Sequence, residues 1–405
     1  MTTHRWFASA GWLALAACAS HPPHTAAIPT SATLAARLAP VQRVLDSAIT
    51  AGAAPGAVLA VSVRGERFVY GTGVLGIGDS TRPTGVTVYD MASLTKVIVL
   101  TTLAMQAVDE GKLDLDAPVA RYLPDFLRGS GAKSSVTVRD LLLHDSGLPA
   151  HRPLWKETFV REGAILRTVT SNLDTVPGAR MVYSDLGAIT VTAILEKLYG
   201  KRIDHLFATK VSGPLGLQRM RYLPPRGWRR DIAPTENDPW RGHILRGEVH
   251  DENAARLSGV SGHAGLFASA EDLLRFGEWA LAGSRTQGAP GPLQPPKEFA
   301  TWTITQDHPV GSSRGLGWDT PSGVSSAGSI MSARSFGHTG FTGTSVWVDP
   351  TREVVIVLLT NRVHPTRNTP KFGLIRPTVA DAVMRTLFPG APPREPAALP
   401  RRSTN

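Results

Sequence analysis

Short apolar segments rich in β-branched residues lie near both ends of this 405-residue chain, and helical segments fill the distance between them. Residues 57–63 and 67–70 predict a hairpin around a turn at Arg64-Gly65. Residues 345–348 and 354–359 predict two further strands. Because strands at both ends enclose a helical stretch, we expect an α+β fold in which both termini build one sheet and a helical region is inserted between them.

Apolar residues recur at helical spacing in several segments of the chain. In residues 34–49, Pro40 leaves open whether the segment is one kinked helix or two short ones. The other predicted helices cover residues 97–106, 138–143, 188–198, 273–281 and 376–387.

These elements set the expected domain limits. We expect one folded domain over residues 34–388, with an α/β part at about 34–110 and 320–388 and a helical part at about 111–319. Residues 19–33 predict a flexible tether, and the Pro- and Arg-rich residues 389–405 predict a disordered tail.

The first 18 residues have the pattern of an export signal. A short polar start is followed by an apolar stretch that is too brief to span a bilayer and that ends in Leu15-Ala16-Ala17-Cys18. This ending resembles a bacterial lipoprotein box, which implies lipidation of Cys18, the single cysteine; the alternative is a chance cysteine in an ordinary signal peptide. No later segment is long and apolar enough to cross a membrane. We therefore expect a periplasmic lipoprotein, and Ala19 after the cysteine favours the outer membrane.

The net charge of +10 limits the possible partners. A nucleic-acid-binding chain would gather this charge in clusters with interleaved aromatic residues. Here the arginines are scattered, and the densest groups are Arg226, Arg229 and Arg230, and Arg401-Arg402. We expect a basic surface that faces anionic wall polymers or lipid headgroups, and no nucleic-acid partner.

Ser93 and Lys96 are the first candidates for chemistry. They are three residues apart at the start of the predicted helix, so both side chains lie on one face within hydrogen-bonding reach. The positive end of the helix dipole and partial burial both disfavour a protonated lysine. A neutral Lys96 amine can take the proton of Ser93, which makes the serine a nucleophile.

Two later motifs supply possible companions. Tyr183-Ser184-Asp185 precedes a predicted helix, and the phenol of Tyr183 can relay protons. Gly337-His338-Thr339-Gly340 precedes the strand that starts at Ser345. We expect the backbone amides of Ser93 and Phe341 to form an oxyanion hole. The segment Leu141-Leu142-Leu143-His144-Asp145-Ser146-Gly147-Leu148-Pro149 ends a helix with a glycine turn and is interpreted as architectural.

Together these motifs resemble the class C β-lactamase-like serine hydrolases, a family that includes β-lactamases, DD-peptidases, amidases and esterases. The resemblance runs from about Leu34 to Leu387. It implies a β-lactamase/transpeptidase-like fold, with an antiparallel sheet flanked by terminal helices, and an active site beside an inserted helical domain. It also implies an acyl-enzyme on Ser93, proton transfer by Lys96 and Tyr183, and substrate contacts from Asp185, His338, Thr339 and Gly340.

Two residues depart from the family pattern. Asp185 stands where the family usually has asparagine, and a carboxylate there would hold Lys96 charged and favour Tyr183 as the base. His338 stands where β-lactamases and DD-peptidases usually have lysine, and histidine is mostly neutral above pH 7. This difference weakens the case for an efficient β-lactamase, because esterases and amidases of the family often carry histidine there.

A second polar cluster contains His250, Asp251 and His263. Its His-Asp-x-Asn-Ala run resembles a loop of wall-recycling amidases and DD-carboxypeptidase-like proteins. We expect these three side chains to contact substrate; the alternatives are a loop held by its own hydrogen bonds and a metal site. We expect no bound metal and no cofactor.

The sequence thus predicts a lipid-anchored, monomeric serine hydrolase that cleaves a peptidoglycan-derived amide, as a DD-carboxypeptidase or amidase, or a small ester. One alternative is a β-lactamase. Another is a non-catalytic wall-binding or penicillin-sensing lipoprotein with the same fold. A third is a zinc hydrolase that uses His250 and His263.

Overall fold

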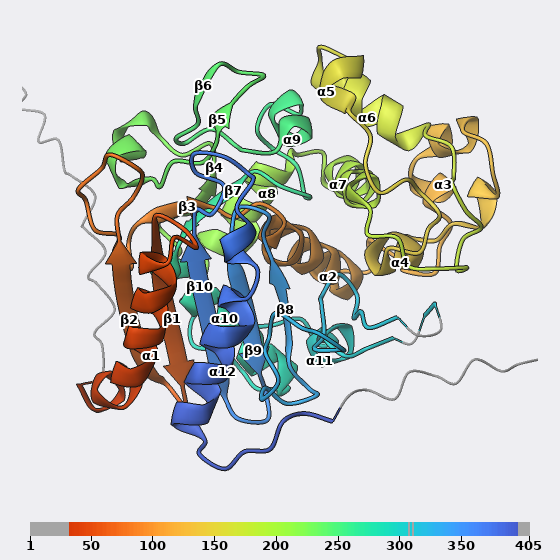
Figure 1. The fold of residues 1–405 in the computed structure, drawn as a ribbon. Coiled ribbons are helices and arrows are strands. Elements are labelled where there is room, and N and C mark those ends of the chain that lie inside the picture. Colours follow the sequence, from red (N-terminus) through yellow and green to blue (C-terminus); the bar gives the residue numbers. More distant parts are fainter. Residues whose placement is uncertain (1–31, 307, 310–311, 396–405) are drawn as a thin grey trace, which may run out of the picture.

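The computed structural model describes residues 32–306, 308–309 and 312–395 (Figure 1). The predicted signal peptide, Cys18 and most of the tether lie outside these residues. The α-helices are α1 (Ala32–Thr50), α2 (Thr102–Asp109), α3 (Val119–Tyr122), α4 (Val138–Leu143), α5 (Leu154–Glu157), α6 (Arg161–Val169), α7 (Asp185–Tyr199), α8 (Ile203–Phe207), α9 (Glu252–Arg256), α10 (Ala270–Ser284), α11 (Phe299–Trp302) and α12 (Ile375–Leu387).

The strands are β1 (Gly56–Val63), β2 (Glu66–Gly73), β3 (Val88–Asp90), β4 (Met220–Tyr222), β5 (Asn237–Asp238), β6 (His243–Ile244), β7 (Leu266–Ser269), β8 (Phe336–Thr339), β9 (Ser345–Asp349) and β10 (Val354–Thr360). Short helices of other types are the π-helices η1 (Lys96–Thr101) and η4 (Ala208–Ser212), and the 3₁₀ helices η2 (Pro124–Arg128), η3 (Lys133–Ser135), η5 (Arg226–Asp231) and η6 (Pro370–Phe372).

The predicted sheet of both termini is confirmed. Five antiparallel strands stand in the order β2-β1-β10-β9-β8, and β1 pairs directly with β10, where Val58 lies opposite Leu359. The predicted hairpin is also present, with Val63 opposite Glu66 around the left-handed turn residues Arg64 and Gly65. The α+β expectation is therefore correct.

Strand alternation divides the core into two layers. Leu59 and Val61 of β1 face the helices α1 and α12, which lie side by side on one face of the sheet (Figure 1). Val58 and Ala60 face the other way, into the layer that α10 covers. Because both faces of the sheet are covered, the strands β1, β9 and β10 are buried along their whole length.

Several local expectations are refined by the structure. Helix α1 is continuous through Pro40. Residues 97–106 are helical, but the first part is the π-helix η1, and α2 follows it. Helix α10 lies within the predicted helical region 111–319 but packs on the main sheet, because its apolar face meets β1, β9 and β10.

The start of the predicted disordered tail is attached to the body of the protein. Arg394 donates hydrogen bonds to the carbonyl oxygens of Gly328, Ser329 and Met331. The rest of this tail, residues 396–405, lies outside the described residues. Within the described part of the chain, no helix has both the length and the hydropathy that a membrane span requires.

Candidate active site

Ser93 lies in a tight turn between β3 and η1. The residue before it, Ala92, has a φ of 46°, in the left-handed region that non-glycine residues rarely adopt. The carboxylate of Asp90 accepts a hydrogen bond of 2.8 Å from the Ala92 amide. Asp90 therefore stabilises the strained turn that presents the Ser93 hydroxyl.

Lys96 is almost completely buried, and its ammonium group has three close oxygen neighbours. Lys96 Nζ lies 2.7 Å from Asp185 Oδ1 and 3.1 Å from both Ser93 Oγ and the carbonyl oxygen of His263. Burial lowers the pKa of Lys96, but the opposing effect of Asp185 and Tyr183 is larger, so the pKa is raised. The expectation of a neutral Lys96 amine is therefore wrong. Lys96 is instead held in its charged form, which is the effect expected from the Asp185 carboxylate.

Tyr183 is held in the site by its surroundings. The ring of His144 packs against the Tyr183 ring with centroids 4.6 Å apart, and His144 Nδ1 accepts a hydrogen bond from the Ser184 amide. Lys96 Nζ lies 4.9 Å from the centre of the Tyr183 ring. The Tyr183 hydroxyl is buried and has no hydrogen-bond partner among the described residues. The ring is therefore held by its neighbours, while its oxygen is not committed to a hydrogen bond.

His144 comes from the turn that the sequence analysis treats as architectural. It has the left-handed conformation that ends α4, with a φ of 61°. Burial and the charges of Arg314 and Lys96 lower the pKa of His144. The neutral His144 ring thus packs on Tyr183. This contact supports the architectural interpretation of the turn, and it also holds Tyr183 in position.

The loop after β8 approaches the turn before Ser93 closely. Thr342 Oγ1 donates to the carbonyl oxygen of Asp90, and Thr344 Oγ1 donates to that of Met91. A Cβ atom on Gly340 would lie only 2.5 Å from the Met91 carbonyl oxygen. Glycine thus permits an approach that brings the backbone of Phe341 towards Ser93. The pairing of these two amides as an oxyanion hole stays a prediction.

His338 is buried beside Tyr183, with ring centroids 5.9 Å apart. Burial lowers the pKa of His338, and the charges of Arg314 and Lys96 act in the same direction. His338 Nδ1 lies 2.8 Å from the carbonyl oxygen of Thr339, so in the neutral ring this nitrogen carries the proton. Nε2 is then a free acceptor, without a partner among the described residues.

A cavity of about 490 Å³ opens at these residues. It is lined by Ser93, Tyr183, Arg314, His338, Thr339, Gly340, Phe341, Arg362, Phe372, Gly373 and Arg376. The structure therefore brings the predicted residues Ser93, Tyr183, His338, Thr339, Gly340 and Phe341 to one cavity. Lys96 and Asp185 form their ion pair next to it.

Three arginines of this cavity were not among the residues predicted from the sequence. Arg314 lies over the Tyr183 ring, 5.1 Å from its centre, and its Nη1 atom is buried without a partner among the described residues. Arg362 covers the exposed Phe341 ring. Arg376 donates to the carbonyl oxygens of Gly340 and Thr344, and burial lowers its pKa to about 9. No sequence motif marks these residues, because each comes from a different segment.

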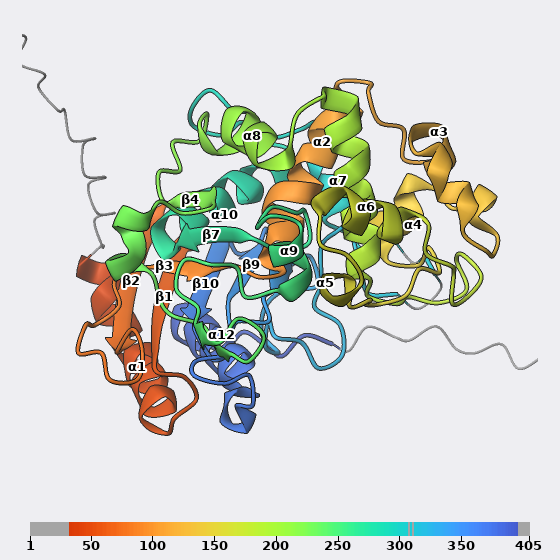
Figure 2. The ribbon, with the colours of Figure 1, turned by 90° about the horizontal axis from the view of Figure 1, so that it is seen from above.

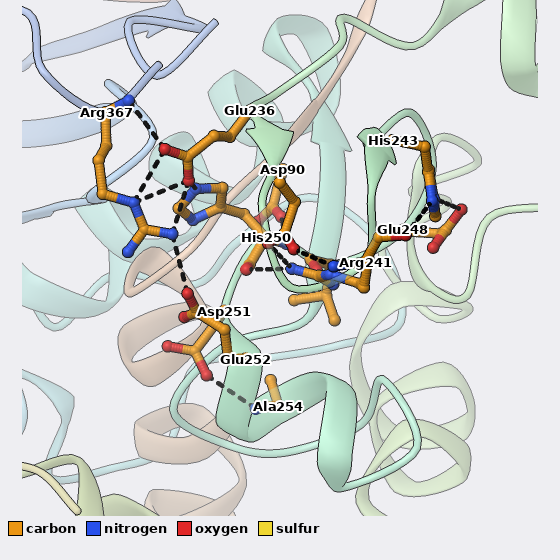
Figure 3. A network of polar contacts seen from close by, with 12 residues as sticks. Asp90, Glu236, Arg241, His243, Glu248, His250, Asp251, Glu252, Ala254 and Arg367 are labelled. Atoms are coloured by element: carbon orange, nitrogen blue, oxygen red, sulfur yellow. Dashed lines mark hydrogen bonds and ion pairs between the residues drawn. The ribbon is translucent and has the colours of Figure 1, made fainter. Parts of the chain in front are cut away.

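His250, Asp251 and His263 do not line this cavity. His250 donates its backbone N–H to Asp90 and contacts Glu236, which in turn binds Arg367 (Figure 3). His263 Nε2 lies 2.9 Å from Asp251 Oδ1, and the two histidine rings are buried. These contacts favour the alternative of a loop held by its own hydrogen bonds. They do not support the expected substrate contact.

The zinc-hydrolase alternative has no support in the described part of the chain. There, the group of histidine and acidic side chains with ligand atoms close enough for a metal ion is Asp140, Asp145 and His308. It contains neither His250 nor His263. In this group, His308 Nδ1 lies 2.5 Å from Asp145 Oδ2.

Helices α2 and α7 lie side by side next to the sheet (Figure 2). A hydroxyl beside a buried cation and a phenol is the arrangement of a serine hydrolase. A model of the Beta-lactamase family matches residues 41–379, so the chain belongs to this family of serine hydrolases. The resemblance inferred from the motifs is confirmed.

Known relatives agree with this assignment. A protein of Salmonella enteritidis named "Putative D-alanyl-D-alanine carboxypeptidase" is 30% identical over 319 residues, which cover 72% of this chain and 73% of the relative. A protein of the same name from Salmonella agona is 29% identical and covers 70% of this chain and 72% of its own.

Solved structures share the fold at lower identity. A class C β-lactamase superposes with a TM-score of 0.70 at 19% identity, covering 89% of this chain and 99% of that one. A penicillin-binding protein homologue from Caulobacter crescentus gives a TM-score of 0.69 at 18% identity, covering 86% and 97% of the two chains. At these identities the likeness supports the fold alone.

Proposed function

We propose that the protein is a serine DD-carboxypeptidase that removes the terminal residue of a peptidoglycan-derived peptide through an acyl-enzyme on Ser93. The names of the relatives support this substrate class. The observation that carries the proposal is Arg314, which lines the catalytic cavity and whose Nη1 atom has no hydrogen-bond partner among the described residues. A carboxypeptidase substrate ends in a free carboxylate, and an arginine with an unused donor is suited to bind it.

The charge states in the cavity strengthen this interpretation. His338 stands where the family usually has lysine, but the low pKa of this buried ring leaves it uncharged. The positive charge for a substrate carboxylate must then come from elsewhere. Arg376 already donates to two backbone carbonyls and Arg362 to one, whereas Arg314 Nη1 has no such partner among the described residues.

The proposed reaction has two steps. In acylation, Tyr183 reacts as the phenolate, whose negative charge the Lys96 cation stabilises, and it takes the proton of Ser93. Ser93 Oγ attacks the peptide carbonyl carbon, and the amides of Ser93 and Phe341 stabilise the resulting oxyanion. The C–N bond breaks, and Tyr183 returns the proton to the leaving amine. In deacylation, Tyr183 takes a proton from water as the water oxygen attacks the ester carbonyl carbon. The bond between this carbon and Ser93 Oγ breaks, Tyr183 returns the proton to Oγ, and the shortened peptide leaves as the acid.

The test compares a peptide that ends in D-Ala-D-Ala with the same peptide amidated at its C-terminus, with product release read by mass spectrometry. The native protein should release D-alanine from the carboxylate peptide and discriminate against the amide. Arg314→Gln should raise KM for the carboxylate peptide by about 10- to 100-fold, because a charge-assisted hydrogen bond is worth about 1.5–3 kcal/mol. Hydrolysis of a neutral p-nitrophenyl ester should fall much less, because such a substrate has no carboxylate for Arg314 to bind.

Arg121→Gln is the matched control, because Arg121 is exposed in the helical region and pairs with Asp114. Two outcomes would contradict the proposal: equal turnover of the carboxylate and amide peptides, or release of the whole stem peptide, which indicates an amidase. Turnover of esters alone would favour the esterase alternative. Rapid hydrolysis of a chromogenic cephalosporin would favour the β-lactamase alternative.

We also propose that the protein is exported to the periplasm and anchored by a lipid on Cys18. The sequence pattern that ends in Leu15-Ala16-Ala17-Cys18 supports this proposal. Radiolabelled palmitate should be incorporated into the native chain and not into Cys18→Ser. Label that persists in the variant, or a native chain without label, would contradict the anchor. Light scattering of the purified protein tests the expected monomer.

A further inference from the structure

Four arginines line two adjoining surface hollows away from the catalytic cavity. Arg226, Arg229 and Arg246 line both, and Arg230 lines the second. Their volumes are about 480 and 510 Å³. Three of these residues belong to the 3₁₀ helix η5, in which side chains three positions apart lie above one another, so Arg226 and Arg229 project from the same side.

Three of the four charges are not neutralised by the protein. Arg226, Arg229 and Arg230 are exposed and form no ion pair within the described part of the chain. The nearby acidic groups contact other side chains: Asp231 pairs with Arg219, and Glu248, which borders the first hollow, lies 3.0 Å from His243 (Figure 3).

Arg246 is the fixed member of the cluster. Its guanidinium donates to the carbonyl oxygens of Ile232 and Arg230, and it lies 3.5 Å from Asp79. These contacts join the loop after β2 to the end of η5. Like charges held together in this way repel one another, and an anion bound among them removes the repulsion.

Exposed aliphatic side chains stand close to these residues in the sequence, and one of them, Leu223, lines a hollow that shares Gly247 and Glu248 with the first. Leu223, next to Pro224 of the first hollow, is 48% exposed, and Ile77, two residues before Asp79, is 68% exposed. Ile244, two residues before Arg246, is 46% exposed. Arginines together with exposed aliphatic residues suit a lipid surface, where the cations meet headgroups and the aliphatic groups meet the acyl boundary.

We propose that Arg226, Arg229, Arg230 and Arg246 form a binding site for the phosphate groups of anionic phospholipid headgroups. The site would hold the protein against a membrane by a contact separate from any lipid on Cys18. Arginine recognises phosphate through paired N–H donors, and each arginine near an anionic membrane adds about 1 kcal/mol of binding.

The test is co-sedimentation of the full chain with vesicles of phosphatidylglycerol or of phosphatidylcholine. The native protein should bind phosphatidylglycerol more tightly, and added salt should weaken this preference. The triple variant Arg226→Gln, Arg229→Gln, Arg230→Gln should bind phosphatidylglycerol vesicles about 100-fold more weakly. Residues 1–31 are identical in all the proteins compared, so any vesicle binding that they contribute does not alter the comparison.

A charge-matched control separates a local site from net charge. Arg121, Arg128 and Arg385 are exposed, pair with single aspartates and lie on other elements, so their triple glutamine variant loses the same charge. This control variant should bind phosphatidylglycerol vesicles with an affinity within about threefold of that of the native protein. Thermal unfolding and p-nitrophenyl ester hydrolysis should be native in both triple variants, which shows that they are folded.

Three outcomes would overturn the proposal. Equal loss of vesicle binding in both triple variants would show that net charge alone is responsible. Binding of inorganic phosphate that depends on Arg226, Arg229 and Arg230, without vesicle binding, would assign the site to a soluble ligand. Tighter binding of a DNA duplex than of phosphatidylglycerol vesicles would assign it to nucleic acid.

Discussion

Asp185→Asn tests whether a carboxylate keeps Lys96 charged. The two side chains form an ion pair of 2.7 Å, with Lys96 2% and Asp185 21% exposed. Loss of one partner of a buried ion pair destabilises the folded protein by about 3–5 kcal/mol. We expect a destabilisation of about 3 kcal/mol here, because asparagine keeps an oxygen and Asp185 is partly solvated. Since one pKa unit corresponds to about 1.36 kcal/mol, the affinity of Lys96 for its proton should fall about 100-fold.

The assay is the pH dependence of kcat/KM for a p-nitrophenyl ester. In the native protein the raised pKa keeps Lys96 protonated, so its titration should not limit activity below about pH 10. In Asp185→Asn, deprotonation of Lys96 removes the cation beside Tyr183, so kcat/KM should fall on an alkaline limb that the native protein lacks. Asp185→Glu keeps the charge and should restore the native profile.

The same ion pair should affect stability. The pKa of Lys96 is higher in the folded than in the unfolded chain, so its contribution to stability is complete below the unfolded value of about 10.4 and is lost as pH rises through the folded value. Urea unfolding at pH 7 should therefore show a less stable Asp185→Asn. Superimposable pH profiles and equal stability of the two proteins would refute the reasoning.

Three further changes test other parts of the structure. Burial lowers the pKa of Lys133 to about 8, so the folded chain binds fewer protons than the unfolded chain between about pH 8 and 10.4. The free energy of unfolding should therefore rise by about 1–3 kcal/mol as pH increases over this range. Urea titrations of Lys133→Met should not show this rise. Gly340→Ala would place a Cβ 2.1 Å from Thr344 Oγ1 and 2.5 Å from the Met91 carbonyl, so kcat for ester hydrolysis should fall about 100-fold. Tyr183→Phe keeps the ring but removes the proton carrier, so kcat should fall about 10²- to 10⁴-fold with little change in KM, measured by steady-state kinetics.

Each of these changes has an outcome that contradicts the account. An unchanged pH slope in Lys133→Met would mean that this lysine is not the group that titrates. Gly227→Ala, whose added Cβ meets open space, is the control for Gly340→Ala, and equal losses in both would exclude the close approach as the cause. Native turnover in Tyr183→Phe would assign the proton transfer to Lys96.

The sequence was sufficient to predict the sheet and the central residues of the site. The apolar, β-branched strands at the two ends of the chain are buried by pairing with each other, and the spacing of Ser93 and Lys96 depends on local helical geometry. Motifs of this kind are readable because their residues are close in the chain. The charge of Lys96 was not readable from local spacing, since it depends on Asp185, 89 positions away, and on burial.

The remaining features of the site depend on tertiary packing. Arg314, Arg362 and Arg376 meet in one cavity only after separate segments have folded, and none lies in a recognisable motif. His250 and His263 had the residue types of a binding loop, but whether a loop faces the cleft or the interior is decided by its partners, here Glu236 and Asp251.

The central claim is that the Ser93 hydroxyl is the nucleophile, and intact-protein mass spectrometry after brief incubation with a fluorophosphonate tests it most directly. The native protein should gain a single adduct, which peptide mapping places on Ser93, and Ser93→Ala should gain none and lose ester hydrolysis. An adduct on another residue, or ester hydrolysis that persists in Ser93→Ala, would contradict the claim.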